Sequence, residues 1–301
     1  MKKNKIFYWI CDKSDNTGEG KLALYFINNL KIKNNINQIK KPKFKNKFFK
    51  KIVNHKYVLP VLGIFYCWKY FIYNKKTYYI NYLPFWNFLI FFLLPPNSNI
   101  GPITGGARFD KKSNFIRKII FPICYKISET IVNYRKFTLI FSTDLLKKFL
   151  SKKTIKKSSF NFIIKNFRYK KKTYHKTIDF LIYFRNHKNK KNNFPYYFIK
   201  DLIREGYNVN VVGDKIKMQN LINLGFIDNK KLMKLQKKTK FTIFSHENLY
   251  SIFTLECIQN NVLVIIDKSK KFNLNFFKNN FIKIDFKNQK EIKNIRNYFR
   301  K

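Results

Sequence analysis

Acidic residues are scarce in this 301-residue sequence, which has 16 of them against 63 basic residues. The formal net charge is therefore +47. Such a charge favours an anionic partner, either a nucleic acid or a membrane surface. The basic residues are spread along the chain and form no tail-like block. The charge thus favours anionic partners without identifying one.

Cysteine is scarce as well. The four cysteines, Cys11, Cys67, Cys124 and Cys257, lie far apart and form no CxxC pair. This spacing argues against a disulfide framework or a cysteine metal site, and it favours buried free thiols in a reducing compartment. We therefore expect a cytoplasmic protein.

Patterns of the common nucleic-acid-binding modules are absent too. The sequence contains no zinc-finger, RNP-type or homeodomain pattern, so no specific nucleic acid is expected as a partner. A basic nucleic-acid-binding protein is kept as an alternative function, because it would account for the charge and predicts steeply salt-dependent binding.

Long hydrophobic runs are missing, although hydrophobic residues make up 45% of the chain and can fill a large core. A membrane-spanning helix needs roughly 20 apolar residues. Proline, glycine or lysine interrupts or brackets the two longest runs, Tyr57–Tyr73 and Leu83–Pro96. We expect both to be buried core, with shallow docking on a membrane surface as the alternative. The short run Ile6–Cys11 is followed by polar residues, which predicts a first strand and not a signal peptide.

The first half opens with the start of a βα unit. The strand Ile6–Cys11 is followed by a glycine-containing loop that includes Gly18–Gly20, and apolar residues then recur at helical spacing over 21–30. Residues 100–109 contain three glycines and a proline, which predicts a tight loop. The polar, basic segment 151–177 predicts a domain boundary near residue 172.

In the second half, strands alternate with helices. Apolar strands are predicted at 177–184, 207–214, 222–228, 241–245 and 262–267, and helices at 196–206, 229–240 and 251–261. This alternation is typical of a parallel sheet covered on both faces. We predict a Rossmann-like α/β domain here and the same class for the first half.

Candidate binding residues follow the ends of these strands. Ligands of open α/β sheets bind outside the carboxyl ends, where helix N-termini offer N–H groups to anions. The residues found there are cations, backbone donors and carboxylates, which suit a phosphorylated ligand that also has hydroxyl groups. They are Gly18, Glu19, Gly20, Arg185, Lys190, Gly213, Glu247, Asn248, Leu249, Tyr250 and Glu256. No DxD follows a strand, so no metal is implied.

Several of these motifs occur in the order found in a known family. Arg185 and Lys190 follow one strand, Gly213 ends the next, and Glu247 and Glu256 precede the apolar run 262–266. GEG at 18–20 and GPITGGARF at 101–109 stand where the family has glycine-rich loops. In this order the motifs resemble the retaining glycosyltransferases of the GT-B fold, the group called glycosyl transferases group 1.

The resemblance implies a GT-B type α/β fold with two Rossmann-like domains facing across a cleft. Residues 1–172 would form the acceptor-side domain and residues 173–301 the nucleotide-sugar-binding domain, with the last helix packing back on the first domain as an option. The implied activity is metal-independent glycosyl transfer, without a cofactor, from a nucleotide-diphosphate sugar to a saccharide or lipid-linked acceptor. Such enzymes build cell-surface polysaccharide, lipopolysaccharide or glycolipid. The basic, aromatic first half would suit a peripheral position on the anionic cytoplasmic face of the inner membrane.

The resemblance also implies catalytic roles. Arg185 and Lys190 would hold the donor diphosphate and stabilise the departing nucleotide, because their charge is needed most as the glycosidic bond breaks. Glu247 would position the donor sugar.

Binding roles follow in the same way. Glu256 would accept hydrogen bonds from the nucleotide ribose, and Gly213 and the backbone N–H groups of Asn248–Tyr250 would belong to the donor site. In the first domain, Gly18–Gly20 and the pair Gly105 and Gly106 would approach the phosphates or the acceptor.

Each assignment has a simpler alternative. With 63 basic residues in 301, a cation after a strand is expected by chance, and an acidic residue such as Glu247 is favoured by the helix dipole in any first turn. One more residue separates Glu247 from Glu256 than in the family. The family's closing glycine is also missing, so Asn260 or Asn261 is expected to end the helix. A degenerate GT-B protein that binds nucleotide without turnover is therefore a third hypothesis.

Overall fold

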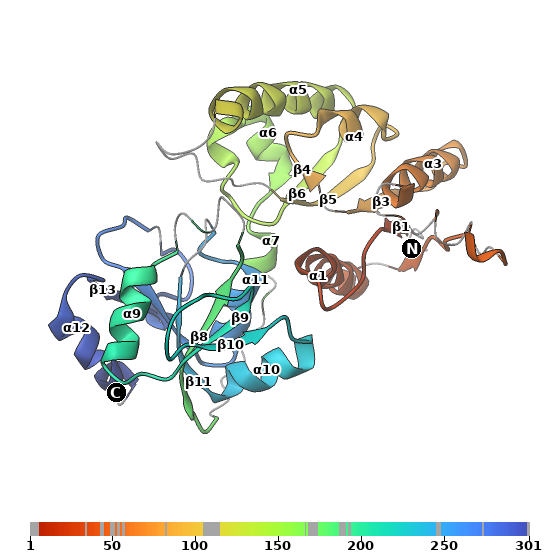
Figure 1. Cartoon of the computed structure of the whole chain (residues 1–301). Helices are drawn as coiled ribbons and strands as arrows, with labels where there is room; N and C mark the ends of the chain where they lie inside the picture. Colours follow the sequence, from red (N-terminus) through yellow and green to blue (C-terminus); the bar gives the residue numbers. More distant parts are fainter. Residues whose placement is uncertain are drawn as a thin grey trace. The chain divides into compact units, whose positions relative to one another are not determined.

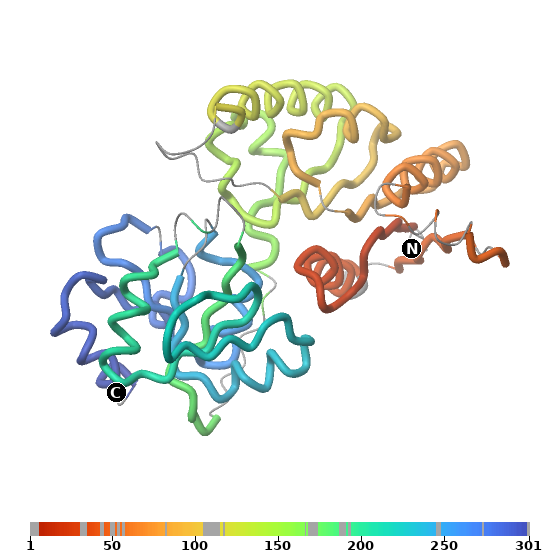
Figure 2. Tube along the Cα trace, in the orientation of Figure 1, coloured from red at the N-terminus to blue at the C-terminus, as the bar shows by residue number. Residues whose placement is uncertain are grey.

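The computed structural model describes residues 6–33, 35–42, 45–48, 52, 55, 58–81, 83–104, 115–165, 167, 174–186, 191, 194–244, 248–272 and 274–299. The chain divides into two units, Met1–Asn166 and Phe167–Lys301 (Figure 1). Figure 2 traces the chain through one unit and then the other. The boundary expected near residue 172 lies outside the described residues.

A seven-stranded, all-parallel sheet forms the centre of the first unit. Its strand order is β2-β1-β3-β5-β6-β7, with β4 paired to β5. The strands are β1 (Ile6–Ile10), β2 (Ile36–Gln38), β3 (Thr77–Ile80), β4 (Leu83–Pro84), β5 (Asn99–Thr104), β6 (Thr138–Phe141) and β7 (Ser158–Ser159).

Helices cover both faces of this sheet (Figure 1). One face is covered by α3 (Val58–Ile72), α4 (Phe88–Leu93) and α5 (Phe121–Tyr134), which continues the π-helical turn η1 (Ile116–Ile120). The other is covered by α1 (Gly18–Lys33) and α7 (Phe162–Lys165). The unit also contains the shorter η2 (Lys147–Phe149) and α6 (Lys152–Lys157).

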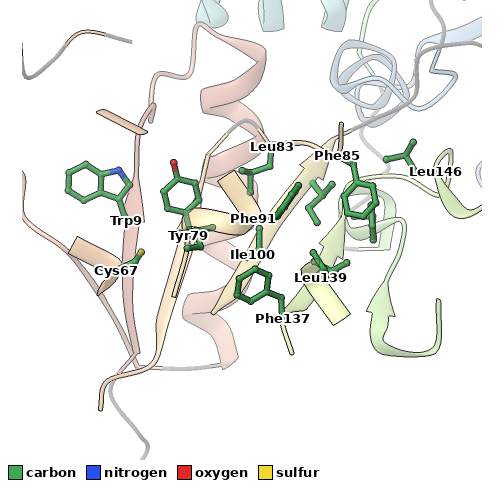
Figure 3. Close-up of a cluster of buried hydrophobic side chains, with 14 of the residues drawn as sticks. Trp9, Cys67, Tyr79, Leu83, Phe85, Phe91, Ile100, Phe137, Leu139 and Leu146 are labelled. Carbon is green, nitrogen blue, oxygen red and sulfur yellow. The ribbon is translucent and has the colours of Figure 1, made fainter. Parts of the chain in front are cut away.

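The alternation of side chains along β1 creates the two cores. Trp9 points to the α3–α5 side, whereas Tyr8 and Ile10 point to the α1 side, because successive strand residues face opposite ways. Figure 3 shows the larger core, in which Trp9, Tyr79 and other labelled side chains pack together.

The second unit contains a six-stranded, all-parallel sheet. Its order is β10-β9-β8-β11-β12-β13. The strands are β8 (Ile178–Phe184), β9 (Val209–Gly213), β10 (Ile222–Gly225), β11 (Thr239–Ile243), β12 (Leu263–Asp267) and β13 (Phe281–Ile284). The helices are α9 (Tyr196–Arg204), α10 (Asn229–Lys238), α11 (Ile252–Gln259) and α12 (Gln289–Lys293), with 3₁₀ turns η3 (Lys278–Asn280) and η4 (Asn294–Phe299). Two Rossmann-like α/β units are thus confirmed.

The C-terminal elements have their partners in the second unit. Ile292 of α12 and Ile295 of η4 belong to the core beside α9. Tyr207 Oη donates to the carbonyl of Ile292 at 3.0 Å, and the Arg296 guanidinium lies 4.5 Å from the Tyr207 ring. These contacts bury the apolar side of the last helix within the second unit. Packing of this helix on the first domain was the option kept from the sequence.

Parts of two predicted loops are regular structure. A tight glycine loop was expected at residues 100–109, but residues 99–104 form β5, with a register irregularity against β6 between Ile100 and Ile103 that absorbs Gly101 and Pro102. Gly18–Gly20, also expected as a loop, form the first turn of α1. Glycine and proline therefore mark a strand irregularity and a helix start here. The loop predictions are wrong for residues 18–20 and 100–104, the loop at residues 12–17 is confirmed, and residues 105–109 lie outside the described residues.

The prediction of buried core for the two long apolar runs is only half right. Leu59 and Cys67 of α3 and Phe91 of α4 are buried, but Phe65 and Phe92 are more than half exposed. No helix among the described residues is long and apolar enough to cross a membrane.

Candidate functional site

The order of sheet strands in the second unit defines where a ligand is expected. Taken from β8 onward, the order β10-β9-β8-β11-β12-β13 is the 3-2-1-4-5-6 order of dinucleotide-binding folds. The direction in which strands are added reverses between β8 and β11. Such folds bind ligands outside the carboxyl ends of the two strands at this reversal. Arg185 directly follows β8, and the chain from Asn248 into α11 follows β11.

Arg185 is held at this edge by residues in or directly after three strands. Its Nε lies 3.7 Å from Asp214 Oδ2, one residue beyond β9, and its Nη1 donates to Tyr183 Oη at 3.2 Å. The guanidinium carbon lies 5.4 Å from the ring centre of Phe226, beyond β10. Because the ion pair is largely exposed, it contributes little stability and mainly orients the guanidinium.

Gly213 brings Asp214 to Arg185. Its φ is +104°, and a Cβ there would lie 2.1 Å from the Phe184 carbonyl oxygen, so only glycine fits. Asp214 N then donates to the same carbonyl at 3.0 Å, and Asp214 Oδ2 accepts from Asn186 N at 2.7 Å. Gly213 therefore joins the ends of β8 and β9.

The segment before α11 is ordered by its own side chains. Asn248 Oδ1 accepts from Tyr250 N at 3.0 Å, so this N–H, expected at the donor sugar, is already bonded. Leu249 and Tyr250 are each 9% exposed, and Tyr250 Oη bonds to both N and O of Phe276. Ser251 caps α11 by accepting from Thr254 N at 3.2 Å.

An aromatic pair joins the two sides of the reversal point. Tyr183 of β8 stacks on Phe253 in the first turn of α11, with ring centres 5.5 Å apart. Since Tyr183 also accepts the hydrogen bond from Arg185, the cation and the start of α11 belong to one connected set. Sequence reasoning missed both aromatic residues. Tyr183 is next to last in an apolar strand, and Phe253 lies in the first turn of the helix that follows β11; these positions were the available signal.

Glu256 lies on α11, one turn after Phe253. It is 6% exposed, in agreement with the burial expected from its apolar neighbours. Residues three apart share a helix face, so Glu256 lies on the side of α11 that carries the aromatic contact. Its carbonyl accepts from the Asn260 side chain at 2.9 Å, and Asn261 adopts a φ of +57°. The predicted asparagine closure of this helix is therefore confirmed.

Lys176 holds the other end of α11. Its side chain is buried, and Nζ donates to the Asn260 carbonyl at 2.7 Å. Burial lowers the pKa of Lys176 to about 8. Burial also raises the pKa of the neighbouring Cys257 thiol, which makes that cysteine an inert core residue.

The first unit has a second candidate edge. Its order β2-β1-β3-β5-β6-β7 reverses direction between β1 and β3, so the residues after β1 lie at the equivalent place. Asp12 organises this segment by accepting from Ser14 N at 2.8 Å and from Thr17 Oγ1 at 2.5 Å. Thr17 Oγ1 in turn accepts from Gly20 N at 2.9 Å.

Partial burial shifts the pKa values of titratable groups around this loop. Lys41 Nζ donates to the Cys11 carbonyl at 3.1 Å, and burial lowers the pKa of Lys41. Glu19 is largely exposed. Partial desolvation and, to a smaller extent, the nearby charge of Asp12 raise the pKa of its carboxyl group. Burial raises the pKa of the Cys11 thiol to about 11.

Four predicted site residues lie outside the described residues. They are Lys190, Glu247, Gly105 and Gly106. The described residues contain no group of three or more histidine, cysteine, aspartate or glutamate side chains that could hold a metal ion.

Comparison with known proteins relates the chain by structure alone. No known protein family and no curated protein matches its sequence. A solved structure that resembles it is that of a Listeria monocytogenes protein assigned as a UDP-N-acetylglucosamine 2-epimerase, with a TM-score of 0.50 and 9% identity. The match covers 99% of this chain and 90% of that one. The fold is GT-B-like. At 9% identity this likeness concerns the architecture, namely two parallel-sheet α/β units in one chain.

Proposed function

We propose that the chain is a glycosyltransferase that moves a sugar from a nucleoside-diphosphate donor to a saccharide or lipid-linked acceptor. The observation that supports it best is the position of Arg185 at the reversal point of a 3-2-1-4-5-6 sheet, linked through Tyr183 and Phe253 to the first turn of α11. The GT-B-like architecture agrees with this proposal.

In the proposed reaction, the diphosphate binds at Arg185 and the capped N-terminus of α11, because a guanidinium and helix N–H groups both favour phosphate oxygens. Lys190 supplies a second cation. The bond between the anomeric carbon and the diphosphate oxygen breaks, and the diphosphate leaves with the bonding electrons. The acceptor hydroxyl oxygen forms the new bond to the anomeric carbon, and its proton passes to the departing diphosphate oxygen. Positive charge beside the leaving group lowers the barrier, so no metal is required.

The remaining residues bind hydroxyl groups in this proposal. Glu256 accepts from the nucleotide ribose, and Glu247, with the backbone of Asn248 and Leu249, positions the donor sugar. Gly18–Gly20, in the first turn of α1, bind the acceptor or the phosphates in this proposal.

The proposal predicts a specific effect of Arg185. Full-length protein is incubated with a panel of nucleotide sugars and candidate acceptors, and released nucleoside diphosphate is measured. Arg185→Ala is expected to lower kcat/KM roughly 100-fold, the usual cost of losing one group that stabilises developing negative charge. Arg185→Lys is expected to fall between the two, since it keeps the charge but loses the planar fork.

Arg204→Ala is the matched control, since Arg204 is another exposed arginine with a carboxylate neighbour, at the far end of α9. It should leave the rate unchanged. Unaltered turnover in Arg185→Ala, or no binding of any nucleoside diphosphate by the native chain, would contradict the proposal. Binding without turnover would support the nucleotide-binding site but contradict the proposed transferase activity.

A second candidate is epimerisation of a nucleotide sugar, favoured by the assignment of the structural neighbour as a 2-epimerase. The two reactions differ in product. An epimerase returns a nucleotide sugar with one inverted carbon and needs no acceptor, whereas a transferase releases nucleoside diphosphate in proportion to glycosylated acceptor. Analysis of the product by NMR separates them.

A further inference from the structure

The outer surface of the helices over one face of the first sheet is apolar. Among the described residues, 24 large hydrophobic side chains are exposed, and sixteen of them lie on or beside α3, α4 and η1–α5. We call these sixteen the apolar layer. They are Val61, Phe65, Trp68, Ile72, Tyr73, Trp86, Leu89, Phe92, Leu93, Phe115, Ile116, Ile119, Ile120, Ile123, Ile127 and Tyr134.

On α3 the exposed residues form a stripe. Val61, Phe65, Trp68 and Ile72 recur every three or four residues, so they share one side of the helix. The buried residues Leu59, Gly63 and Cys67 lie on another side, against the sheet. The helix is therefore apolar both toward the core and toward the outside, whereas the outer face of an ordinary surface helix is polar.

The segment η1–α5 has the same double character. Ile116, Ile120, Ile123 and Ile127 recur at helical spacing and are 39–56% exposed. Tyr125, Ser128 and Val132 are buried on the opposite side.

Specific contacts make the three helices one continuous layer (Figure 1). Trp68 Nε1 donates to the Leu93 carbonyl at 2.7 Å, which joins α3 to α4. Trp86 stacks on Phe121 at 5.3 Å, which joins the entry of α4 to α5. The Arg135 guanidinium lies 5.4 Å from the Phe92 ring and closes the other end of α4.

The charge around the layer has one sign. The sequence contains no acidic residue from Lys21 to Phe109. Glu129, the acidic residue of α5, is buried and accepts from Ser151 N at 2.6 Å and Lys126 Nζ at 3.3 Å. The lysines Lys69, Lys118 and Lys126, in contrast, are exposed.

We propose that the apolar layer docks this chain on the surface of an anionic lipid bilayer. Its aliphatic side chains and Phe65 would enter the acyl boundary, Trp68 and Trp86 would lie at headgroup level, and the lysines would contact anionic headgroups. At 15 residues, α3 is about 22 Å long, too short to span a hydrocarbon core of roughly 30 Å. The layer therefore fits a position along the membrane surface. A protein partner would find no exposed carboxylate on α3, α4 or α5 for its own cations.

The test is sedimentation of the full chain with vesicles of phosphatidylcholine alone and of phosphatidylcholine with phosphatidylglycerol. Binding is expected to the anionic vesicles, with much weaker binding to the neutral ones. The double variant Phe65→Glu plus Ile123→Glu is expected to reduce partitioning roughly tenfold or more, because both side chains leave the apolar phase and bring charge to it. Both positions are more than half exposed, so the fold is expected to survive.

The control is the double variant Tyr197→Glu plus Met233→Glu. These residues are exposed hydrophobics on α9 and α10 of the second unit, and the substitutions change the net charge by the same amount. Only a small loss of binding is expected. Equal losses in the two variants would show attraction by overall charge and overturn the proposal. So would a chain that ignores vesicles but forms a dimer that Phe65→Glu plus Ile123→Glu disrupts. The proposal concerns the first unit and stands or falls separately from the donor site.

Discussion

Gly18 and Gly20 occupy the same first turn of α1 but have different surroundings. A Cβ on Gly18 would meet nothing within 4 Å, whereas one on Gly20 would lie 2.1 Å from the Ser14 carbonyl oxygen and 2.7 Å from Ser14 N. Glycine at 20 is therefore explained by the chain that Asp12 folds against the helix. A ligand is not needed to explain it.

A pair of substitutions tests this reading. Gly20→Ala is expected to destabilise the protein by about 1–3 kcal/mol, because backbone atoms of Ser14 must move. Gly18→Ala should be neutral or stabilising by up to about 1 kcal/mol, since alanine favours the helix. Urea unfolding of both variants supplies the free energies. Similar losses in the two would contradict the argument.

At the scale of elements, α11 is held at both ends. Ser251 caps its N-terminus, and the buried Lys176 binds the Asn260 carbonyl at its C-terminus. Glu256 lies between these anchors, so the helix carries the proposed ribose ligand on a fixed support. The cap and the closing asparagine were readable in the sequence, because both act within a few residues. Lys176 was not, because 84 residues separate it from Asn260.

The lowered pKa of Lys176 predicts a pH effect. The folded protein releases the Lys176 proton near pH 8, and the unfolded chain releases it near 10.5. Between these values the unfolded state binds more protons, so this residue makes stability rise with pH. Relative to Lys176→Met, the native chain should gain roughly 3 kcal/mol from pH 8 to 10.5. Urea unfolding of both proteins at several pH values measures the difference, and a flat difference would mean that the ammonium group is well solvated when folded.

Strand β5 shows where element prediction failed. Gly101 and Pro102 indicate a turn when only neighbouring residues are considered. They are nevertheless buried between β3 and β6, where a Cβ on Gly101 would lie 3.1 Å from atoms of Ile140. The close approach of β6 explains the glycine, and that contact spans about 40 residues of chain.

At the scale of the whole molecule, charge is the dominant feature. The net charge is +47, so the basic side chains repel one another on average, and folding brings them closer together. Added salt should therefore stabilise the protein by screening.

This predicts that the thermal midpoint rises as NaCl increases from about 20 to about 300 mM, over which the Debye length falls from roughly 20 to 6 Å. Calorimetry or circular dichroism measures it. Sodium acetate should give the same rise as NaCl if screening is the cause. A midpoint that falls with salt would show that attractive ion pairs outweigh the repulsion.

The sequence by itself determined the class of both units. Apolar strands that alternate with amphipathic helices predict a covered parallel sheet, because that pattern depends only on local periodicity. It also placed Arg185 and the start of α11 after strand ends.

Only the tertiary structure decided which strands are neighbours. The strand order in each sheet determines the two reversal points. The contacts of Tyr183 with Arg185 and Phe253 join Arg185 to α11, and Gly213 links the ends of two strands. The structure also decided that seven apolar residues of α3 and α5, from Val61 on α3 to Tyr134 on α5, are exposed. Composition predicts how much apolar surface a chain has, but the side that is buried depends on where the sheet lies, which long-range pairing alone determines.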